Sequence, residues 1–308
     1  MAGMSLRAFV IVNPASAGGA TRRRWSRLAP ELRRALGPFE HAFTTGPHQA
    51  TTLARRAIEA RFEMIVAVGG DGTVSEIVGG FFDGVRPVAP GVVLGIAPQG
   101  TGGDLARTLG MRGFEDACGR LGGDLTLAAD VGHARFVGHD GRPAERVFLN
   151  AASFGCSGVV TGALSASSKR LGSLAFALAT ARALVGYRDQ PVSLALDGSP
   201  AETLTITTCA VCNGGFFGGG MQVAPNARLD DGWLDVTIWA GFGLAEFVRH
   251  RRALYDGSHV RLPGTRLART RSLAATSPED VLLELDGESV GRLPLNVELF
   301  PGALRLKV

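Results

Sequence analysis

The amino-acid sequence predicts an α/β domain with a parallel sheet, followed by a mainly antiparallel β-sandwich domain. Up to about residue 121, short apolar runs alternate with segments of helical periodicity. This rhythm is typical of parallel strands with helices on both faces of the sheet. Beyond that point apolar runs follow one another, and many are separated by turn residues, including Asp-Gly pairs, which favour tight hairpins. We expect the first domain at residues 1–125 and the second at residues 126–308.

In the first domain we expect strands at residues 8–12, 39–44, 64–68 and 92–97, and helices at residues 22–36, 49–60 and 74–82. The first of these helices ends at Gly37-Pro38, a pair typical of helix ends. In the second domain we expect one helix at residues 172–185 and strands at residues 124–137, 146–151, 192–196, 204–211, 233–239, 281–285 and 295–299.

The net charge of +4 comes largely from arginines, which cluster at residues 22–34 and 249–252. Such clusters form solvated helix faces or attract anionic membrane surfaces. No aromatic platform accompanies them, so we expect no nucleic-acid partner. The apolar stretch at residues 171–185 contains Arg182 and is shorter than the roughly 20 residues of a spanning helix. The apolar run near the first residue is too short for a signal peptide. We therefore expect a cytoplasmic protein with peripheral membrane contact.

Four cysteines are present, and Cys209 and Cys212 form a Cys-x-x-Cys within an expected strand. No second pair stands at a zinc-binding spacing. We interpret the cysteines as buried structural thiols, which suits a reducing compartment.

Three loops of the first domain are built from small residues and leave the carboxyl ends of expected strands, at residues 13–19, 69–73 and 98–104. Ligands of open α/β sheets bind at such ends. Small residues let backbone N–H groups approach an anion, and a following helix N-terminus favours phosphate. The sequence has no Gly-Lys-Ser/Thr of a P-loop and no Gly-x-Gly-x-x-Gly after the first strand. A different kind of phosphate site is therefore predicted.

Asp71 stands inside the second of these loops, where its carboxylate would repel phosphate unless a cation lay between them. Mg²⁺ prefers one or two carboxylates together with phosphate oxygens, and Asp104 in the third loop invites the same interpretation. The alternative is that Asp71 caps a helix.

The chain resembles the diacylglycerol kinase catalytic-domain family, which includes bacterial soluble lipid kinases and the sphingosine and ceramide kinases. The matching motifs cover almost the whole chain in order. They are Asn13-Pro14-x-Ser16-x-Gly18-Gly19, Gly69-Gly70-Asp71-Gly72-Thr73 with Glu76, Gly100-Thr101-x-x-Asp104-Leu105-Ala106-Arg107, Asn150-x-x-Ser153-x-Gly155, Gly218-Gly219-Gly220-Met221-x-x-Ala224-Pro225-x-Ala227, Asp231-Gly232-x-Leu234-Asp235 and Asp286-Gly287-Glu288.

This resemblance implies an NAD kinase/diacylglycerol kinase-like nucleotide-binding domain and a β-sandwich domain, with ATP and Mg²⁺ as cofactors and ATP in the cleft between the domains. Together with the three loops, it implies nucleotide contacts by Asn13, Thr44, Gly69, Gly70, Asp71, Gly72, Thr73, Val74, Ser75, Gly100, Thr101 and Asp104. It implies metal contacts by Asp71, by Asp231 and by the backbone carbonyls of Arg228 and Trp233. Glu288 matches the base that acts on the lipid hydroxyl, and Asp71 is the second expected catalytic residue.

Two positions depart from the family pattern, because Ser75 and Gly103 stand where asparagine is usual. Each change removes an amide that could contact phosphate or orient an aspartate. Two residues also have plainer interpretations. Glu288 can be an ordinary carboxylate next to a hairpin turn, and Asp231 can have a structural role.

The leading hypothesis is a lipid kinase that transfers the γ-phosphoryl group of ATP to the hydroxyl of a diacylglycerol-, sphingoid- or ceramide-like lipid, with Glu288 as the base. The sequence does not identify the lipid or locate its acyl-chain pocket, and a homodimer is possible. Two alternatives stay open. One is an NAD kinase-like enzyme, which shares the Gly-Gly-Asp-Gly-Thr loop, and the other is a silent nucleotide- or lipid-binding protein.

Overall fold

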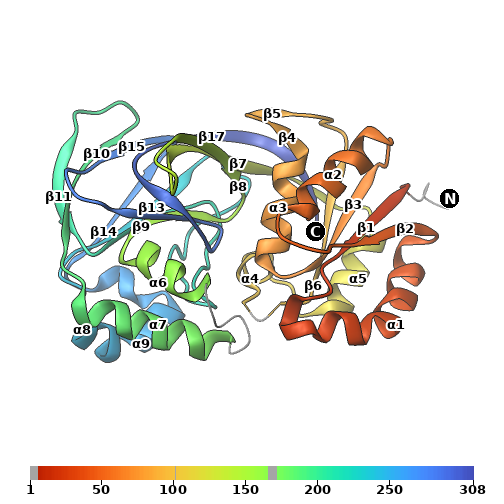
Figure 1. Cartoon of the computed structure of the whole chain (residues 1–308), viewed down its shortest axis with the longest axis horizontal. Helices are drawn as coiled ribbons and strands as arrows, with labels where there is room; N and C mark the ends of the chain where they lie inside the picture. The colour runs from red at the N-terminus through yellow and green to blue at the C-terminus, as the bar shows by residue number, and fades with distance from the viewer. Residues whose placement is uncertain (1–5, 101, 166–171) are drawn as a thin grey trace. The chain divides into compact units, whose positions relative to one another are not determined.

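The computed structural model describes residues 6–100, 102–165 and 172–308. The chain divides into two compact units (Figure 1). The first contains Met1–Ala129 together with Pro301–Val308, and the second contains Asp130–Phe300. The final segment of the chain therefore belongs to the first unit. The α/β domain and the β-sandwich domain predicted from the sequence are both confirmed.

The first unit is built on a parallel sheet with strand order β17-β6-β3-β1-β2. Figure 1 shows α1 and α5 on one face of this sheet and α2 and α3 on the other. The strands of the first unit are β1 (Ala8–Val12), β2 (Phe39–Phe43), β3 (Met64–Gly69), β4 (Phe82–Asp83), β5 (Arg86–Pro87), β6 (Val93–Pro98) and the end of β17 (Glu288–Lys307). Of these, β4 and β5 form a separate two-stranded sheet. Its helices are α1 (Ser16–Leu36), α2 (Gln49–Glu59), α3 (Asp71–Phe81), α4 (Asp104–Thr108) and α5 (Phe114–Gly122).

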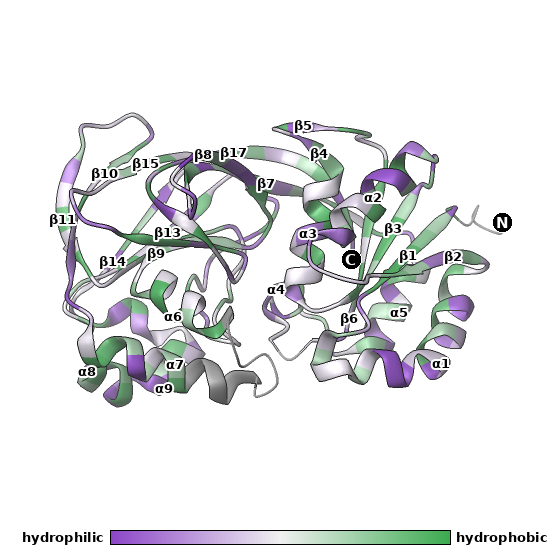
Figure 2. Ribbon diagram, in the orientation of Figure 1, coloured by the Kyte–Doolittle hydropathy of each residue, from purple (hydrophilic) through white to green (hydrophobic). Residues whose placement is uncertain are grey.

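The parallel strands are buried because they carry apolar side chains on both faces. Every residue of β3 is buried, and Figure 2 shows β1 and β3 as mainly hydrophobic, whereas α1 carries many hydrophilic residues. On one face, side chains of β1 and β3 pack with Leu32 and Leu36 of α1 and with Leu121 of α5. This double cover explains the near-continuous apolar runs in the sequence.

The second unit begins within β7 (Thr126–Gly138) and contains two connected antiparallel arrays. One has the order β14-β13-β12-β9-β16-β17, and in the other β17 pairs with β15, which pairs with β10 and through it with β11. The strands are β8 (Pro143–Phe148), β9 (Ala151–Gly155), β10 (Gln190–Leu196), β11 (Glu202–Ile206), β12 (Thr208–Cys212), β13 (Leu234–Trp239), β14 (Thr265–Thr270), β15 (Ser272–Thr276) and β16 (Leu282–Leu285). The helices are α6 (Cys156–Ser165), α7 (Gly172–Gly186), α8 (Leu244–Arg249), α9 (Arg251–Asp256) and the short 3₁₀ helix η1 (Ser258–Arg261).

Successive side chains of β12 point alternately into two different apolar cores. Cys209 faces a core between the strands, with Phe148, Phe154 and Leu285, whereas Cys212 faces a second core under the helices. The two thiols therefore point to opposite faces of one strand and cannot bind the same metal ion. All four cysteines are free and buried, and burial raises the pKa of the Cys156 thiol to about 12. The predicted structural role of the cysteines fits this arrangement.

Several details of the predicted second domain are wrong. The expected strand at residues 204–211 is divided at Thr207 between β11 and β12, and β14 and β15 were not predicted. The expected strand at residues 146–151 is divided between β8 and β9, because the N–H groups of Leu149 and Asn150 bind the Asp286 carboxylate instead of a neighbouring strand. The expected single helix at residues 172–185 corresponds to α7, but α6, α8 and α9 are also present. Within the described residues, no helix is both long and apolar enough to span a membrane.

Candidate active site

Two of the predicted glycine-rich loops cross each other at the carboxyl ends of β3 and β6. The N–H of Gln99 donates to the carbonyl of Gly69 at 2.7 Å. A Cβ built on Gly100 would lie 2.6 Å from the Cα of Gly70, which leaves no room for a side chain at Gly100. The glycines therefore allow one backbone to lie directly against the other.

The first predicted loop, at residues 13–19, joins the same edge of the sheet. The N–H of Asn13 donates to the carbonyl of Val68, and Asn13 Nδ2 donates to Thr73 Oγ1, both at 2.9 Å. The N–H of Thr44 donates to the carbonyl of Val12 at 2.9 Å, which places Thr44 beside the end of β1. The structure thus brings Asn13, Thr44, the 69–73 segment and Gly100 together at one edge.

The Asp71 carboxylate holds the start of α4. Its Oδ2 accepts the N–H of Asp104 at 3.1 Å, and its Oδ1 accepts the N–H of Leu105 at 3.2 Å. A Cβ built on Gly102 would lie 2.9 Å from Asp71 Oδ2, so glycine at that position keeps this side of the carboxylate open. Asp71 therefore orders the third loop relative to the second. Each carboxylate oxygen also keeps a lone pair for a further partner.

The remaining predicted residues of this edge differ in their exposure. Asp104 is buried and forms an ion pair with Arg107 at 3.2 Å. Thr73, Val74 and Ser75 are also buried, on the inner side of α3. Gly72 is partly buried, and Thr101 lies outside the described residues. Gly103 has a φ of +66°, in the left-handed region that glycine and asparagine both adopt, so replacing the usual asparagine keeps the backbone conformation.

In the second unit, the Asp286-Gly287 pair forms the predicted hairpin turn between β16 and β17, with φ of +47° and +80°. The Asp286 carboxylate accepts the N–H groups of Leu149, Asn150 and Ala151 at 2.9–3.1 Å. Burial raises the pKa of Asp286, although these three donors oppose the shift. Asp286 thus fastens the turn to the start of β9.

Glu288 follows this turn as the first residue of β17, and its side chain is 31% exposed. Its Oε2 accepts a hydrogen bond from Arg146 Nη1 at 2.7 Å. Arg146 lies on β8 and is itself mostly buried, with 22% of its side chain exposed. The carboxylate is therefore held in one orientation by a charge-assisted hydrogen bond.

Asp231 lies in a turn that holds several charges. Its Oδ1 accepts the N–H of Trp233 at 3.1 Å, and its Oδ2 binds Arg269. Arg269 also lies 3.6 Å from Asp235 Oδ2, which is buried and has no hydrogen-bond partner among the described residues. Burial raises the pKa of Asp235, Arg269 lowers it, and Asp231 raises it.

The expected metal set of Asp231 with Arg228 and Trp233 therefore contains a carboxylate that pairs with an arginine. Arg228 itself pairs with Asp230 at 3.3 Å, and the Arg269 guanidinium lies 5.4 Å from the centre of the Trp233 ring. Across residues 6–100, 102–165 and 172–308, no group of three or more His, Cys, Asp or Glu side chains is arranged to hold a metal ion.

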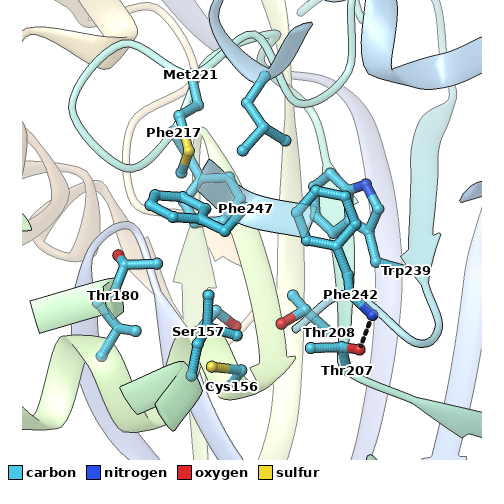
Figure 3. A pocket seen from close by; sticks show the side chains of 13 residues that line it. Cys156, Ser157, Thr180, Thr207, Thr208, Phe217, Met221, Trp239, Phe242 and Phe247 are labelled. Atoms are coloured by element: carbon cyan, nitrogen blue, oxygen red, sulfur yellow. Dashed lines mark hydrogen bonds between the residues drawn. The ribbon is translucent and has the colours of Figure 1, made fainter. Parts of the chain in front are cut away.

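An apolar cavity of about 70 Å³ lies under the helices of the second unit (Figure 3). Its wall is mainly aromatic and aliphatic, with a few hydroxyl groups and one thiol. The lining residues are Cys156, Ser157, Val160, Thr180, Leu184, Thr207, Thr208, Phe217, Met221, Trp239, Phe242, Phe247 and Leu254. Such a wall suits a hydrocarbon segment better than a polar ligand.

Comparison with known proteins agrees with these features. Residues 7–134 match the diacylglycerol kinase catalytic domain, and residues 150–308 match the YegS C-terminal NAD kinase beta sandwich-like domain. A diacylglycerol kinase of Bacillus subtilis (strain 168) is 30% identical over 295 residues, which cover 94% of this chain and 91% of that protein. The chain belongs to the diacylglycerol kinase family. The family resemblance stated from the sequence is thereby confirmed.

Other members of the diacylglycerol kinase family match over similar lengths. A diacylglycerol kinase of Mycobacterium tuberculosis (strain ATCC 25618 / H37Rv) is 26% identical over 84% of this chain and 81% of that protein. The crystal structure of a diacylglycerol kinase from Bacillus anthracis str. Sterne superposes with a TM-score of 0.73 at 23% identity, covering 99% of this chain and 97% of that one. The latter similarity establishes the fold.

Membership of the diacylglycerol kinase family does not by itself point to three charged residues of the site. Arg146 is the partner of Glu288, Arg269 is the partner of Asp231, and Glu284 accepts the N–H of Gly287 at 2.8 Å. Arg146 and Arg269 lie far along the chain from the carboxylates they bind, and Glu284 has the alternating position of a core-facing strand residue. No local sequence signal marks them.

Proposed function

We propose that this protein is an ATP-dependent lipid kinase, which transfers the γ-phosphoryl group of ATP to the hydroxyl group of a lipid. The observation that carries this proposal is the match to diacylglycerol kinases along both units, at 30% identity over 94% of the chain. The three loops at one edge of the parallel sheet support the nucleotide part of the proposal, because close-packed glycines leave backbone N–H groups available to phosphate.

The acceptor is proposed to be a lipid with a free hydroxyl group and at least one hydrocarbon chain. The apolar cavity of the second unit supports this choice, because Phe217, Trp239 and Phe247 offer a dry wall to a hydrocarbon segment. At about 70 Å³ the cavity as it stands holds only part of an acyl chain. A diacylglycerol is the first candidate, since the relatives bear that name.

Glu288 is proposed to accept the proton of the attacking lipid hydroxyl. As the new bond forms between the lipid oxygen and the γ-phosphorus, the bond to the bridging oxygen breaks and ADP leaves. The ion pair with Arg146 supports this role, because it holds the carboxylate in one orientation. The nucleotide loops belong to the first unit, and Glu288 belongs to the second.

Mg²⁺ is proposed as the cofactor, with Asp71 as its protein ligand. The open side of Asp71 near Gly102 and the free lone pairs of its carboxylate fit a cation shared with phosphate oxygens. Mg²⁺ would neutralise negative charge on the phosphates during transfer. At the second expected site, Asp231 and Asp235, which both pair with Arg269, also suit a cation that would take the place of Arg269.

We also propose that the lipid is reached through contact of helices α7, α8 and α9 with a membrane surface. These helices line the cavity through Leu184, Phe247 and Leu254, and α8 contacts both α7 and α9. Their other faces expose apolar side chains, with Leu178 at 57%, Val185 at 73% and Val248 at 67%. Exposed arginines accompany them, namely Arg182, Arg249, Arg251 and Arg252. Each well-placed cation adds roughly 1 kcal/mol on an anionic membrane.

The test is to incubate the purified protein with γ-labelled ATP and Mg²⁺ in mixed micelles that contain one lipid at a time. Dioleoylglycerol, sphingosine, ceramide and phosphatidylglycerol form the lipid arms, and NAD replaces lipid in a further arm. A labelled lipid that Glu288→Gln fails to produce supports the proposal. Labelled NADP would indicate the NAD kinase-like alternative. Binding of ATP without any labelled product would indicate the silent binding protein.

A further inference from the structure

A line of buried polar groups runs from the wall of the apolar cavity to the turn before Glu288. Ser157 Oγ, which belongs to the cavity wall (Figure 3), lies 2.7 Å from Ser153 Oγ. Ser153 Oγ lies 2.6 Å from Glu284 Oε1, and Glu284 Oε2 accepts the N–H of Gly287 at 2.8 Å. All members of this line belong to the second unit.

These groups are shielded from water. Ser153 is 0% exposed and Glu284 is 1% exposed, while Ser157 is 8% exposed. A carboxylate at such a position is costly unless hydrogen bonds compensate it, and hydrogen bonds there are stronger than in water. The arrangement therefore constrains the conformation of all the groups it joins.

The number of protons limits the hydrogen bonds that these groups form at one time. Each serine hydroxyl has one proton, and the Gly287 N–H can only donate. Ser153 Oγ lies within hydrogen-bond distance of both Ser157 Oγ and Glu284 Oε1, and its single proton can be donated to only one of them at a time. A change at Ser157 therefore alters the hydrogen bond that Glu284 receives from Ser153.

The turn is thus held from two sides by two different carboxylates. Asp286 fastens it to residues 149–151, and Glu284 fastens the N–H of Gly287. Gly287 directly precedes Glu288, so a change in the Glu284 hydrogen bond would change the orientation of the Glu288 backbone. The Glu284 bond also leads to the cavity wall, through Ser153 and Ser157.

We propose that Glu284 is a positioning residue, which fixes the turn before Glu288 and couples it through Ser153 to Ser157 at the cavity wall. This inference rests on the proposed function, since it gives the cavity a role in setting the base. A lipid chain that fills the cavity contacts Ser157, and the hydrogen-bonded line transmits this contact to Gly287. The base is then oriented best when the acceptor is bound.

The first experiment measures hydrogen exchange of the Gly287 amide by NMR in the full-length, ligand-free protein. Glu284→Gln replaces the carboxylate with a weaker, single acceptor and is expected to speed this exchange about tenfold. Ser153→Ala is expected to have a smaller effect of the same sign. Thr237→Val is the matched control, because it removes another buried hydroxyl of this unit, which donates to the carbonyl of Val223 at 2.9 Å.

Gly287 exchange equal to wild type in folded Glu284→Gln would overturn the positioning role. If Glu284→Gln does not fold, Ser153→Ala decides, because it keeps the Glu284 carboxylate but removes the hydroxyl that holds its Oε1. Gly287 exchange equal to wild type in Ser153→Ala would then overturn the coupling. Equal acceleration in Thr237→Val and Ser153→Ala would assign the effect to general destabilisation and would also reject the proposal.

The second experiment adds dioctanoylglycerol as the probe. In wild-type protein the probe is expected to change Gly287 exchange, and in Ser153→Ala it is expected to leave it unchanged. In turnover, Glu284→Gln is expected to lower kcat about tenfold with an unchanged KM for ATP. A raised KM for ATP with normal kcat would contradict the role. If the wild type phosphorylates no lipid, the proposed function fails, whereas the ligand-free exchange measurement still decides on Glu284.

Discussion

Arg146 Nη1 lies 2.7 Å from Glu288 Oε2, and both side chains are less than one-third exposed. The pair joins β8 to the first residue of β17 across a long stretch of the chain. In a half-buried setting such a pair restricts the carboxylate to one orientation more effectively than it would at the surface. The reactivity of Glu288 is therefore expected to depend on Arg146.

Glu288→Gln is expected to abolish lipid phosphorylation, because the amide cannot accept the proton of the lipid hydroxyl. Arg146→Gln keeps Glu288 but removes the charge that orients it, and kcat should fall about 10- to 100-fold, the range expected for a hydrogen bond to a charged group. Steady-state kinetics with the lipid identified by the labelling experiment measure both effects. Wild-type kcat in Arg146→Gln would show that the pair has no role in turnover.

Gly100→Ala is expected to separate the two crossing loops, because the added Cβ would lie 2.6 Å from Gly70 Cα. Neither backbone can yield without moving the N–H groups proposed to bind phosphate. The affinity for ATP, measured by calorimetry, should fall at least tenfold, while the protein stays folded. Gly91→Ala is the control, since nothing lies within 4 Å of the Cβ built there. Equal ATP affinity in the two variants would remove the crossing loops from the binding site.

Asp71→Ala is expected to have two separable effects. Loss of the bonds to the N–H groups of Asp104 and Leu105 should lower the free energy of unfolding by about 1 kcal/mol, as for other helix-capping residues. Denaturant titration measures this loss. If Asp71 is also the Mg²⁺ ligand, Mg²⁺ should no longer enhance ATP binding. Asp71→Asn separates the effects, because it keeps an acceptor for the helix and weakens the metal contact. Unchanged Mg²⁺ enhancement in both variants would contradict the metal role.

Buried His259 is expected to make the protein less stable in acid. Burial lowers its pKa below the ordinary value of 6.5, although the carbonyls of Ala253 and Val223 oppose the shift. The unfolded chain therefore binds a proton near pH 6.5 that the folded protein binds only at lower pH. The free energy of unfolding should fall as pH drops from 6.5 towards the folded pKa.

An NMR titration of the His259 ring and urea unfolding at pH 7.5 and 5.5 test this expectation. The pH-dependent loss of stability should be smaller in His259→Gln than in the wild type. The difference between the two proteins excludes the contribution of other titrating groups. A His259 ring that titrates at or above 6.5 in the folded protein would contradict the prediction.

Val185→Glu is expected to weaken binding to anionic vesicles, because Val185 is 73% exposed on the face of α7 that also carries Arg182. Co-sedimentation with phosphatidylglycerol vesicles measures the binding, which should fall at least fivefold. Leu125→Glu is the matched control, since Leu125 is 72% exposed in the first unit. If both variants bind vesicles equally well, helices α7–α9 are not the membrane contact.

The sequence predicted the parts of the molecule that depend on local patterns. Burial on both faces requires the apolar run at β3, and the crossing of two backbones requires glycine at Gly70 and Gly100. Both requirements leave a pattern that can be read locally in the sequence. The division between β8 and β9 could not be predicted, because its cause is Asp286, more than 130 positions along the chain. Arg146 and Glu284 were not predicted for the same reason. Arg146 binds Glu288, 142 positions along the chain, and Glu284 meets Ser153 only because β9 pairs with β16.

The path of β17 has a consequence for how this fold can be divided. The strand begins at Glu288 in the second unit and ends with Arg305 and Leu306 paired to Val93 and Leu94 of β6. A fragment that stops at Ala129 would leave that edge of β6 bare, with unpaired backbone groups that invite aggregation. No single cut can therefore yield two intact halves. Exchange of one half between family members, by recombination or by protein engineering, has to carry the C-terminal segment along with the N-terminal one.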